Sequence, residues 1–227
     1  SRLSAFYERA GMMQNLNGTE GSVSIIGAVS PQGGDFSEPV TQNTKRFVRC
    51  FWGLDKSLAY ARHFPSINWL TSYSEYADDL KPWYDEHVGP EFVTCRHQMA
   101  HLLQKESELM EIVKLIGADI LPEDQKLVME TARLIRVGFL QQNAYHAIDT
   151  YVPLDKQLRM MELILKLYHG ARDIVSRAIP LSQLKATGIF ESLAKMKYEV
   201  PNDGQEKFAE YDAAIEDALR QVNEANR

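Results

Sequence analysis

The chain has 227 residues, enough for one large domain or two small ones, and its 44% apolar and 25% charged residues are typical of a folded globular protein. Its formal net charge of -6 argues against binding to nucleic acid or to an anionic membrane, because both of those partners are negative. The two cysteines, Cys50 and Cys95, are too few for a disulfide framework or a cysteine-based zinc site, which indicates free thiols in a reducing compartment. No apolar run approaches the roughly 20 residues that cross a bilayer.

The amino-terminal part has the pattern helix, strand, loop, strand, helix. Apolar side chains follow a helical spacing over residues 1–10, and Gly11 ends the pattern. Residues 22–30, SVSIIGAVS, are apolar on both alternating faces, which predicts a strand buried on both sides. A β-prone run, RFVRCFW (46–52), precedes a short helix from Asp55 to His63 that Pro65 stops. Since the chain opens in a helix without an initiating methionine, we expect a piece of a longer protein.

The segment between the two predicted strands, SPQGGDFSEPVTQNT (Ser30 to Thr44), lies where open α/β sheets bind ligands. Gly33 and Gly34 permit positive φ angles and a close approach of the backbone. Asp35 and Glu38 could order a neighbouring subunit's arginine or a water, but such loops are more often plain turns. No Gly-Lys-Ser/Thr phosphate-binding sequence occurs in the chain.

From about Tyr76 onward the apolar pattern has the helical period. The predicted helices run from Phe92 to Ile116 with a stop at Gly117, from Pro122 to about Gly138, from a cap at Asp155 to Gly170, and from a point after Asn202. Their apolar stripes predict a bundle. The predicted fold is mainly α: a truncated α/β piece (residues 1–75) followed by a carboxyl-terminal α-helical bundle (residues 76–227), with the change between Ser72 and Pro90.

Catalytic and metal-binding patterns are weak. His97 and His101 are spaced i, i+4, but they lack the glutamate of a His-Glu-x-x-His site and a third ligand. No serine or cysteine lies in a nucleophile elbow or beside an evident base. Paired carboxylates fit solvated helix faces or first-turn dipole partners better than acid–base pairs. They are Asp78 with Asp79, Asp85 with Glu86, and Glu123 with Asp124. We assign no catalytic and no metal-binding residue.

Three segments together resemble a known family: GAVSPQGGDFSEPVTQNT (27–44), FWGLDKSLAYARHFPSINWLTSYS (51–74) and GFLQQNAYHAIDTY (138–151). Their order and spacing are similar to those of the catalytic A subunit of V/A-type rotary ATPases. The resemblance covers essentially the whole chain and implies the carboxyl-terminal part of that subunit. The α/β piece would then belong to a RecA-like nucleotide-binding domain, and the phosphate-binding loop, the magnesium-binding acid and the catalytic glutamate would lie upstream.

The resemblance implies four nucleotide-binding residues. Phe64 matches the aromatic residue that packs against adenine, and Pro65 follows it as in the family. Ala144 and Tyr145 match the opposite wall of the adenine pocket, where phenylalanine is frequent at the second position. A tyrosine ring keeps a stacking energy of ~1 kcal/mol. Ser30 to Thr44 would line the site near the subunit boundary, with no catalytic role for its acids.

The resemblance also implies cofactors, partners and location. The full-length subunit would bind ATP or ADP with Mg²⁺ and alternate with non-catalytic B subunits in a hexameric ring that couples ATP hydrolysis or synthesis to ion transport. IGADILPEDQKL (Ile116 to Leu127) resembles the helix-turn-helix tip that pushes on the central stalk. The location would be cytoplasmic and peripheral to the membrane, without direct membrane insertion. The isolated chain is expected to bind no cofactor, to hydrolyse no ATP, and to self-associate or hold its strands loosely.

Two alternatives remain open from the sequence. One is the non-catalytic B-type subunit of the same ring, which shares the fold. The other is a free-standing helical interaction module that has kept a relic of an ATPase site. The amino-acid sequences of two segments, GGDFSEPVTQNT (33–44) and FWGLDKSLA (51–59), resemble the catalytic subunit more than the B-type subunit.

Overall fold

The structure is a computed structural model that describes residues 2–226, apart from the side chains of Ile116 and Ala118. The fold is mainly α, as predicted. Contacts divide the chain into a smaller unit, residues 1–52 with 72–76, and a larger unit, residues 53–71 with 77–227. Among the described residues, no helix combines the length and the apolar character that crossing a bilayer requires.

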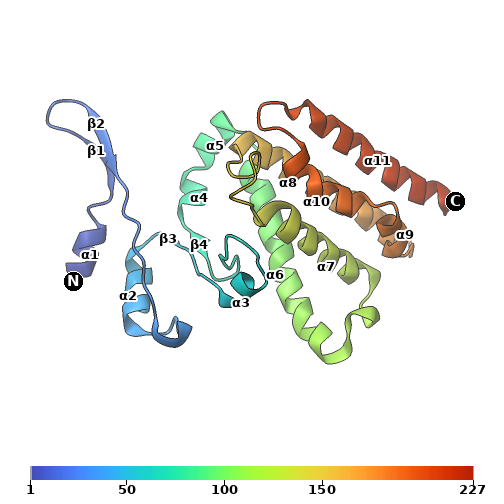
Figure 1. Ribbon diagram of the computed structural model, residues 1–227, viewed down its shortest axis with the longest axis horizontal. Helices are drawn as coiled ribbons and strands as arrows, with labels where there is room; N and C mark the ends of the chain where they lie inside the picture. The colour runs from blue at the N-terminus through green and yellow to red at the C-terminus, as the bar shows by residue number, and fades with distance from the viewer. Residues whose placement is uncertain (1, 227) are drawn as a thin grey trace. The chain divides into compact units, whose positions relative to one another are not determined.

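The smaller unit consists of short elements (Figure 1). They are helix α1 (Arg2–Tyr7), strands β1 (Gly11–Gln14) and β2 (Glu20–Val23), a 3-10 turn (Gln32–Gly34), helix α2 (Pro39–Phe47), and strands β3 (Cys50–Phe51) and β4 (Tyr73–Ser74). β1 and β2 form an antiparallel hairpin in which Gly11 lies opposite Val23. β3 and β4 are also antiparallel.

The strand predicted over residues 22–30 is wrong for most of its length. Only Ser22 and Val23 belong to a strand, and that strand is half of an exposed hairpin, not a buried member of a parallel sheet. Ile26 is 85% exposed. Branched Ile and Val side chains favour extended backbone, but a strand also needs a partner that supplies hydrogen bonds, and the register with β1 ends at Val23.

The second β-prone run and the loop before it also differ from the prediction. Pro39–Phe47 is helix α2, so the predicted loop from Ser30 to Thr44 is helical from Pro39 onward. The Glu38 carboxylate begins this helix by accepting hydrogen bonds from the backbone N–H groups of Val40 (3.2 Å) and Thr41 (3.1 Å). Only Cys50 and Phe51 of the run form a strand.

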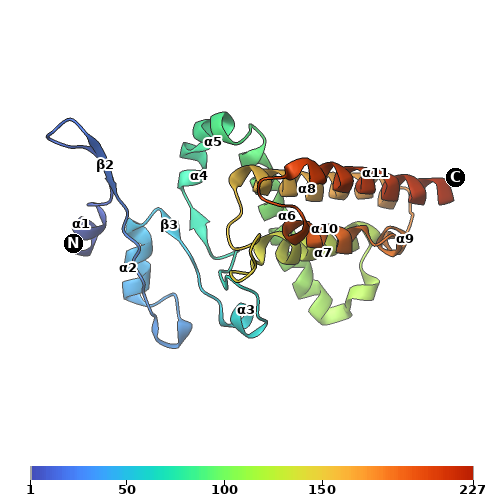
Figure 2. The ribbon, with the colours of Figure 1, turned by 45° about the horizontal axis from the view of Figure 1, so that its top comes forward.

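The larger unit is a helical bundle (Figures 1 and 2). Its helices are α3 (Lys56–Tyr60), α4 (Tyr76–Asp79), α5 (Lys81–His87), α6 (Phe92–Ile116), α7 (Glu123–Ile135), α8 (Leu154–Ser176), α9 (Leu181–Ala186), α10 (Ile189–Glu199) and α11 (Phe208–Ala225). 3-10 turns precede α7 (Ala118–Ile120) and α11 (Gln205–Lys207), and a π turn (Arg136–Leu140) follows α7. Helices α6, α7 and α8 pack against one another, and α11 packs against α8 and α10.

The helix predictions are most accurate where a glycine with a positive φ angle ends the helix. α6 has the predicted bounds and ends at Gly117, whose φ of 87° favours glycine. The predicted stop of α8 at Gly170 is wrong, because the helix continues to Ser176. A Cβ at Gly170 would overlap Leu219 Cδ1, so this glycine permits the close packing of α11 on α8.

Two further helix predictions need correction. Asp155 is not the cap of α8 but lies in its first turn, and the cap position is Pro153. The sequence pattern predicts neither of the two helices between α8 and α11, and the last helix begins at Phe208, after a 3-10 turn. The short α9 and α10 are separated by Gly188 with a φ of 78°, which explains why no long apolar stripe marks them.

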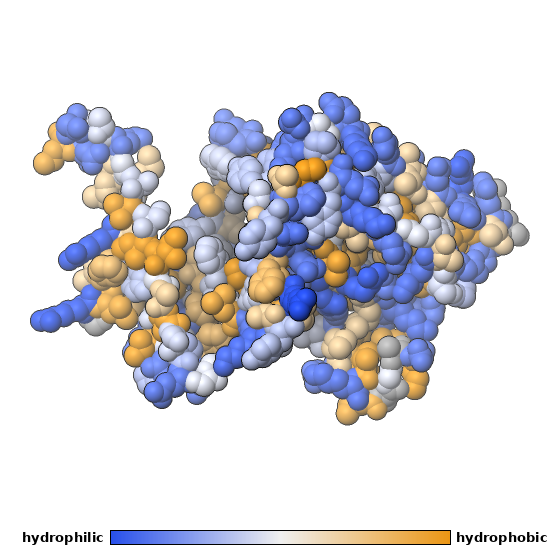
Figure 3. Space-filling model, in the orientation of Figure 1, coloured by the Kyte–Doolittle hydropathy of each residue, from blue (hydrophilic) through white to orange (hydrophobic). Residues whose placement is uncertain are grey.

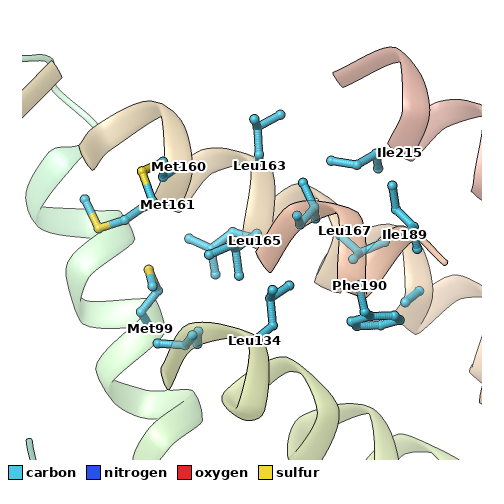
Figure 4. Packing of buried hydrophobic residues seen from close by; sticks show 14 of the residues in the cluster. Met99, Leu134, Met160, Met161, Leu163, Leu165, Leu167, Ile189, Phe190 and Ile215 are labelled. Atoms are coloured by element: carbon cyan, nitrogen blue, oxygen red, sulfur yellow. The ribbon is translucent and has the colours of Figure 1, made fainter. Parts of the chain in front are cut away.

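The hydrophobic core joins five helices (Figure 4). Met99 of α6, Leu134 of α7, Leu167 of α8, Phe190 of α10 and Ile215 of α11 are all at most 4% exposed. Because apolar burial is the main favourable term in folding, this contiguous cluster is expected to supply most of the stability of the bundle.

Helix α9 is attached to α7 by charged groups. Glu123 Oε2 accepts a hydrogen bond from the backbone N–H of Leu181, the first residue of α9, at 2.7 Å. Glu130 is 8% exposed and lies 2.5 Å from Arg133 Nη2 and 2.9 Å from Lys185 Nζ of α9. Burial raises the pKa of Glu130, but the hydrogen bonds from Arg133 and Lys185 outweigh it and leave the pKa below its ordinary value.

We predict that Leu134→Ala lowers the free energy of unfolding by about 2–5 kcal/mol, because it removes buried methyl groups and leaves a cavity. The matched control Leu115→Ala, at a position that is 86% exposed, should cost less than about 0.5 kcal/mol. Urea denaturation followed by circular dichroism measures both. Equal losses for the two variants would contradict the assignment of the core.

We predict that Glu130→Gln destabilises the bundle at pH 7 by roughly 1–3 kcal/mol, because it removes a buried, doubly paired carboxylate. The folded-state pKa of Glu130 lies below its unfolded value, so the ionised group stabilises the fold above the unfolded pKa of about 4.3 and loses this effect as the pH falls through the folded pKa. Urea denaturation between pH 7 and pH 3 should show the two proteins converging. Glu111→Gln, at an exposed pair, should show little difference at any pH.

Candidate functional site

Two loops that are far apart in the sequence meet in the larger unit. The Phe64 carbonyl oxygen accepts a hydrogen bond from the backbone N–H of Gln142 at 2.7 Å. The Gln141 side chain donates to the Arg62 carbonyl oxygen at 3.2 Å. The Phe64–Pro65 peptide bond is cis, and Phe64 is 52% exposed. The structure therefore places the backbone of Phe64 beside the segment that continues to Tyr145.

The segment around Tyr145 is exposed at its tip. Tyr145 is 99% exposed, and its backbone N–H donates to Asn143 Oδ1 at 3.0 Å. Ala144 is also exposed, and its carbonyl oxygen accepts a hydrogen bond from Thr150 Oγ1 at 2.8 Å. The Ala144 and Tyr145 side chains are thus free to contact a ligand, while hydrogen bonds hold their backbone in place.

Asp149 lies at the centre of this loop, residues 141–151. It is 2% exposed, and its Oδ2 accepts a hydrogen bond from the backbone N–H of Asn143 at 2.6 Å. Its carbonyl oxygen accepts one from Gln142 Nε2 at 2.8 Å. The loop is therefore closed on itself by a buried carboxylate, as in compact surface loops whose two ends lie close together.

Two buried lysines support loop 141–151, Lys197 by direct contact and Lys156 through Asn202. Lys197 of α10 is 2% exposed, and its Nζ donates to the carbonyl oxygens of Val137 (2.7 Å) and Gln141. Lys156 of α8 is fully buried, and its Nζ donates to the carbonyl oxygens of Lys197 (3.0 Å) and Val200 (2.7 Å) and to Asn202 Oδ1 (2.9 Å). These carbonyls lie at the carboxyl-terminal ends of the π turn and of α10, where backbone oxygens lack partners within the helix.

Asn202 continues the network to the far end of the loop. Its Nδ2 donates to the carbonyl oxygens of Ile148 (3.0 Å) and Tyr151 (2.7 Å). Burial lowers the pKa of both Lys156 and Lys197, and the negative charge of Asp149 opposes that shift. Sequence reasoning did not identify the two lysines, Asp149 or Asn202 as site residues.

The acids of the predicted ligand loop bind their own backbone. Asp35 Oδ1 accepts hydrogen bonds from the Ser37 hydroxyl (2.6 Å) and the Ser37 N–H (2.9 Å), and these bonds lower the pKa of Asp35. The backbone hydrogen bond from Thr41 lowers the pKa of Glu38. Both carboxylates therefore have a structural function: Asp35 closes a turn with Ser37, and Glu38 caps α2.

Metal and thiol chemistry receive no support from the geometry. His97 Nε2 lies 3.8 Å from Asp78 Oδ1, in an exposed pair. Among the described residues, no three His, Cys, Asp or Glu side chains gather as a metal site. Cys50 and Cys95 are free thiols, as predicted, and burial raises the pKa of Cys95 to about 11, which keeps this thiol protonated and unreactive.

The turn between α6 and α7 forms an apolar tip. Leu115 is 86% exposed and Ile120 is 68% exposed, whereas Leu121 is buried. Figure 3 shows apolar surface gathered at this tip, at the lower right of the view. The side chain of Ile116, the first residue of the predicted stalk-contacting segment, lies outside the described part of the chain.

A groove of about 1180 Å³ lies between this tip, α6, α7 and α9. Charged side chains line it, and they pair with one another. The pairs are Glu106 with Arg136, Glu123 with Lys126, and Glu130 with Arg133 and Lys185. Because the charges within each of these pairs offset one another, the pairs favour neither an anionic nor a cationic ligand.

Both parts of the chain match known families. Residues 1–74 match the nucleotide-binding domain of the ATP synthase alpha/beta family. Residues 81–185 match the C-terminal domain of V and A type ATP synthase. The two matches follow each other along the chain in the order that the resemblance implies.

Three similar relatives are A or alpha chains of ATP synthases. The V-type ATP synthase alpha chain 2 of Clostridium tetani is 57% identical over 203 residues, 89% of this chain and 34% of that relative. The V-type ATP synthase alpha chain of Halothermothrix orenii is 52% identical, over 96% of this chain and 37% of that relative. The A subunit of the A-type ATP synthase of Methanosarcina acetivorans is 51% identical, over 90% of this chain and 35% of that relative.

A solved structure shares the fold. It is described as a unique ATP synthase subunit NeqB from Nanoarcheaum equitans, with a TM-score of 0.59 and 22% identity, over 73% of this chain and 40% of that chain. This likeness supports the fold alone. The sequence relatives decide between the A-type and B-type interpretations, and the chain spans about a third of their length. The chain therefore belongs to the family of V- and A-type ATP synthase A (alpha) subunits, of which it corresponds to a carboxyl-terminal portion.

Proposed function

We propose that this chain provides the adenine side of the nucleotide site, and the stalk-contacting helical bundle, of a V/A-type rotary ATPase. Residues 1–75 would be the last part of the nucleotide-binding domain, and residues 76–227 the bundle. The observation that carries the proposal is the hydrogen bond between Phe64 O and Gln142 N, because it brings together the two segments that the family resemblance assigns to one adenine pocket.

The exposed side chains fit a purine base. Phe64 and Tyr145 are both more than half exposed, so each has aromatic surface free for stacking. Pro65 follows Phe64 and stiffens the backbone there, since its ring restricts φ. Ala144 is small enough to allow a flat ring to approach its backbone. Contacts of this kind select the shape of the base and leave the phosphates to other residues.

The phosphates would be held elsewhere in the full-length subunit. ATP or ADP with Mg²⁺ supplies the phosphoryl chemistry of the family when bound, and that chemistry depends on a phosphate-binding lysine and on magnesium ligands. This chain contains no Gly-Lys-Ser/Thr sequence, and its loop acids are engaged locally, Asp35 in a turn with Ser37 and Glu38 as the cap of α2. The chain would therefore bind and orient the base, and would not perform phosphoryl transfer by itself.

The tip and the bundle would transmit motion. A bundle with a contiguous buried core moves as a rigid body, and the apolar tip at Leu115 and Ile120 offers a surface for the central stalk. In the ring, the full-length subunit would alternate with B subunits. It would lie in the cytoplasmic sector at the membrane surface and couple ATP hydrolysis or synthesis to ion transport.

We predict that Phe64→Ala in the full-length subunit, within the assembled ATPase, raises KM for ATP about fivefold, because stacking on an aromatic ring contributes ~1 kcal/mol. Phe64→Trp should keep KM near its original value. The control Tyr60→Ala removes a nearby ring that is 86% exposed and lies outside the implied pocket, and it should leave KM unchanged. Steady-state ATPase assays measure all three. An unchanged KM for Phe64→Ala would refute the adenine assignment.

We predict that the purified 227-residue chain releases no phosphate from Mg-ATP above the background of a mock purification. The reason is that phosphoryl transfer needs a phosphate-binding lysine and magnesium ligands that this sequence does not supply. A phosphate-release assay checks the prediction. Activity that co-elutes with the chain and persists in Phe64→Ala would show that the chain hydrolyses ATP through residues other than those proposed.

A further inference from the structure

We propose that Lys197 is a positioning residue for the adenine pocket: its buried ammonium group fixes the start of loop 141–151, and thereby the wall that Ala144 and Tyr145 present to the base. The inference rests on the proposed function. It adds a residue that lies far beyond Tyr145 in the sequence and that does not itself reach the ligand.

The need for such a residue arises where α7 ends. The chain leaves the π turn at Gln141, so the carbonyl oxygens of the last turn have no helical N–H donors ahead of them. Unpaired buried carbonyls destabilise a fold, and an exposed loop would normally satisfy them with water. Here Lys197 Nζ donates to Val137 O and to Gln141 O, so one side chain from α10 holds both.

The position of Gln141 is transmitted to the pocket through its neighbour. The N–H of Gln142 donates to Phe64 O, and the Gln142 side chain donates to Asp149 O. Displacing the Gln141 carbonyl would therefore disturb both hydrogen bonds of Gln142. One joins Phe64 to loop 141–151, and the other, to Asp149, closes this loop on itself. Lys197 acts on both walls of the pocket through a single peptide.

The far end of the loop is held by a parallel connection. Lys156 Nζ contacts Asn202 Oδ1 at 2.9 Å, and Asn202 Nδ2 contacts the carbonyl oxygens of Ile148 and Tyr151. Asn202 thus provides a second place at which the loop can be released. A substitution there leaves the two buried ammonium groups in place.

Lysine is well suited to this task. Its ammonium group is a compact charge with three donors that can point at carbonyls in different directions, whereas the planar guanidinium group of arginine is larger and fixed in shape. Lys197 lies at 2% exposure among the apolar residues of α10, and burial alone would favour its neutral form. The carbonyl dipoles and Asp149 supply the compensating negative potential.

The test compares Lys197→Met with Lys195→Met in the full-length subunit of the assembled ATPase. Both substitutions remove one lysine charge from α10, but Lys195 is exposed. The readouts are the dissociation constants of Mg-ADP and of Mg-pyrophosphate, which lacks a base, together with kcat at saturating ATP. We expect Lys197→Met to weaken Mg-ADP binding at least about fivefold, because the carbonyl oxygens of Val137 and Gln141 lose the donor that fixes their position. Mg-pyrophosphate binding and kcat should not change, and Lys195→Met should change nothing.

A loss confined to the base-containing ligand supports a positioning function, since general damage to the fold would weaken both ligands and lower kcat. If Lys197→Met fails to assemble, Lys197→Gln, whose neutral side chain is one bond shorter and keeps a donor, decides by the same comparison. Unchanged Mg-ADP binding in these variants, with weaker binding in Phe64→Ala, overturns the inference and leaves the proposed function intact. Unchanged binding in Phe64→Ala as well refutes the proposed function itself.

Discussion

Two buried ammonium groups connect the helical bundle to loop 141–151, Lys197 directly and Lys156 through Asn202. Lys156 and Lys197 occupy positions where burial disfavours charge, and each is compensated by carbonyl oxygens at a carboxyl-terminal helix end. Removing one partner from such a cluster leaves the others buried and unpaired, so the arrangement is strongly determined once it forms. These contacts also fix the two ends of the loop from Gln141 to Tyr151, although the exposed residues of the loop make few contacts of their own.

The bundle and the loops divide their physical tasks. Apolar burial holds α6, α7, α8, α10 and α11 together without directional constraints. Hydrogen bonds and ion pairs then set where the ends of these helices point: Glu123 fixes the start of α9, and Lys197 the end of the π turn. A packed core whose helix ends are fixed by polar contacts can carry both the exposed loop 141–151 and an exposed apolar tip, since neither has to contribute to the core.

The sequence predicted the long helices well because their determinants are local. The apolar stripe of α6 and the glycine at its end identify both bounds. The failures have nonlocal causes. Gly170 ends no helix because Leu219 of α11 packs over it, and the Ile/Val run after β2 forms no strand because β1 offers it no further partner. In each case the missing information concerned an element elsewhere in the chain.

The candidate site was predictable only in part, for the same reason. Phe64 and Tyr145 came from family resemblance, since an exposed aromatic has no periodic signature. Lys197 did leave a signal: it shares the apolar face formed by Leu193, Met196 and Val200, and a lysine on such a face must either reach solvent or find buried acceptors. The sequence could not say which, because its acceptors Val137 and Gln141 lie 60 and 56 residues away. A charged residue on an apolar helix face is therefore a candidate for a buried group that positions a loop. Only the fold shows whether such a residue finds buried acceptors or reaches solvent.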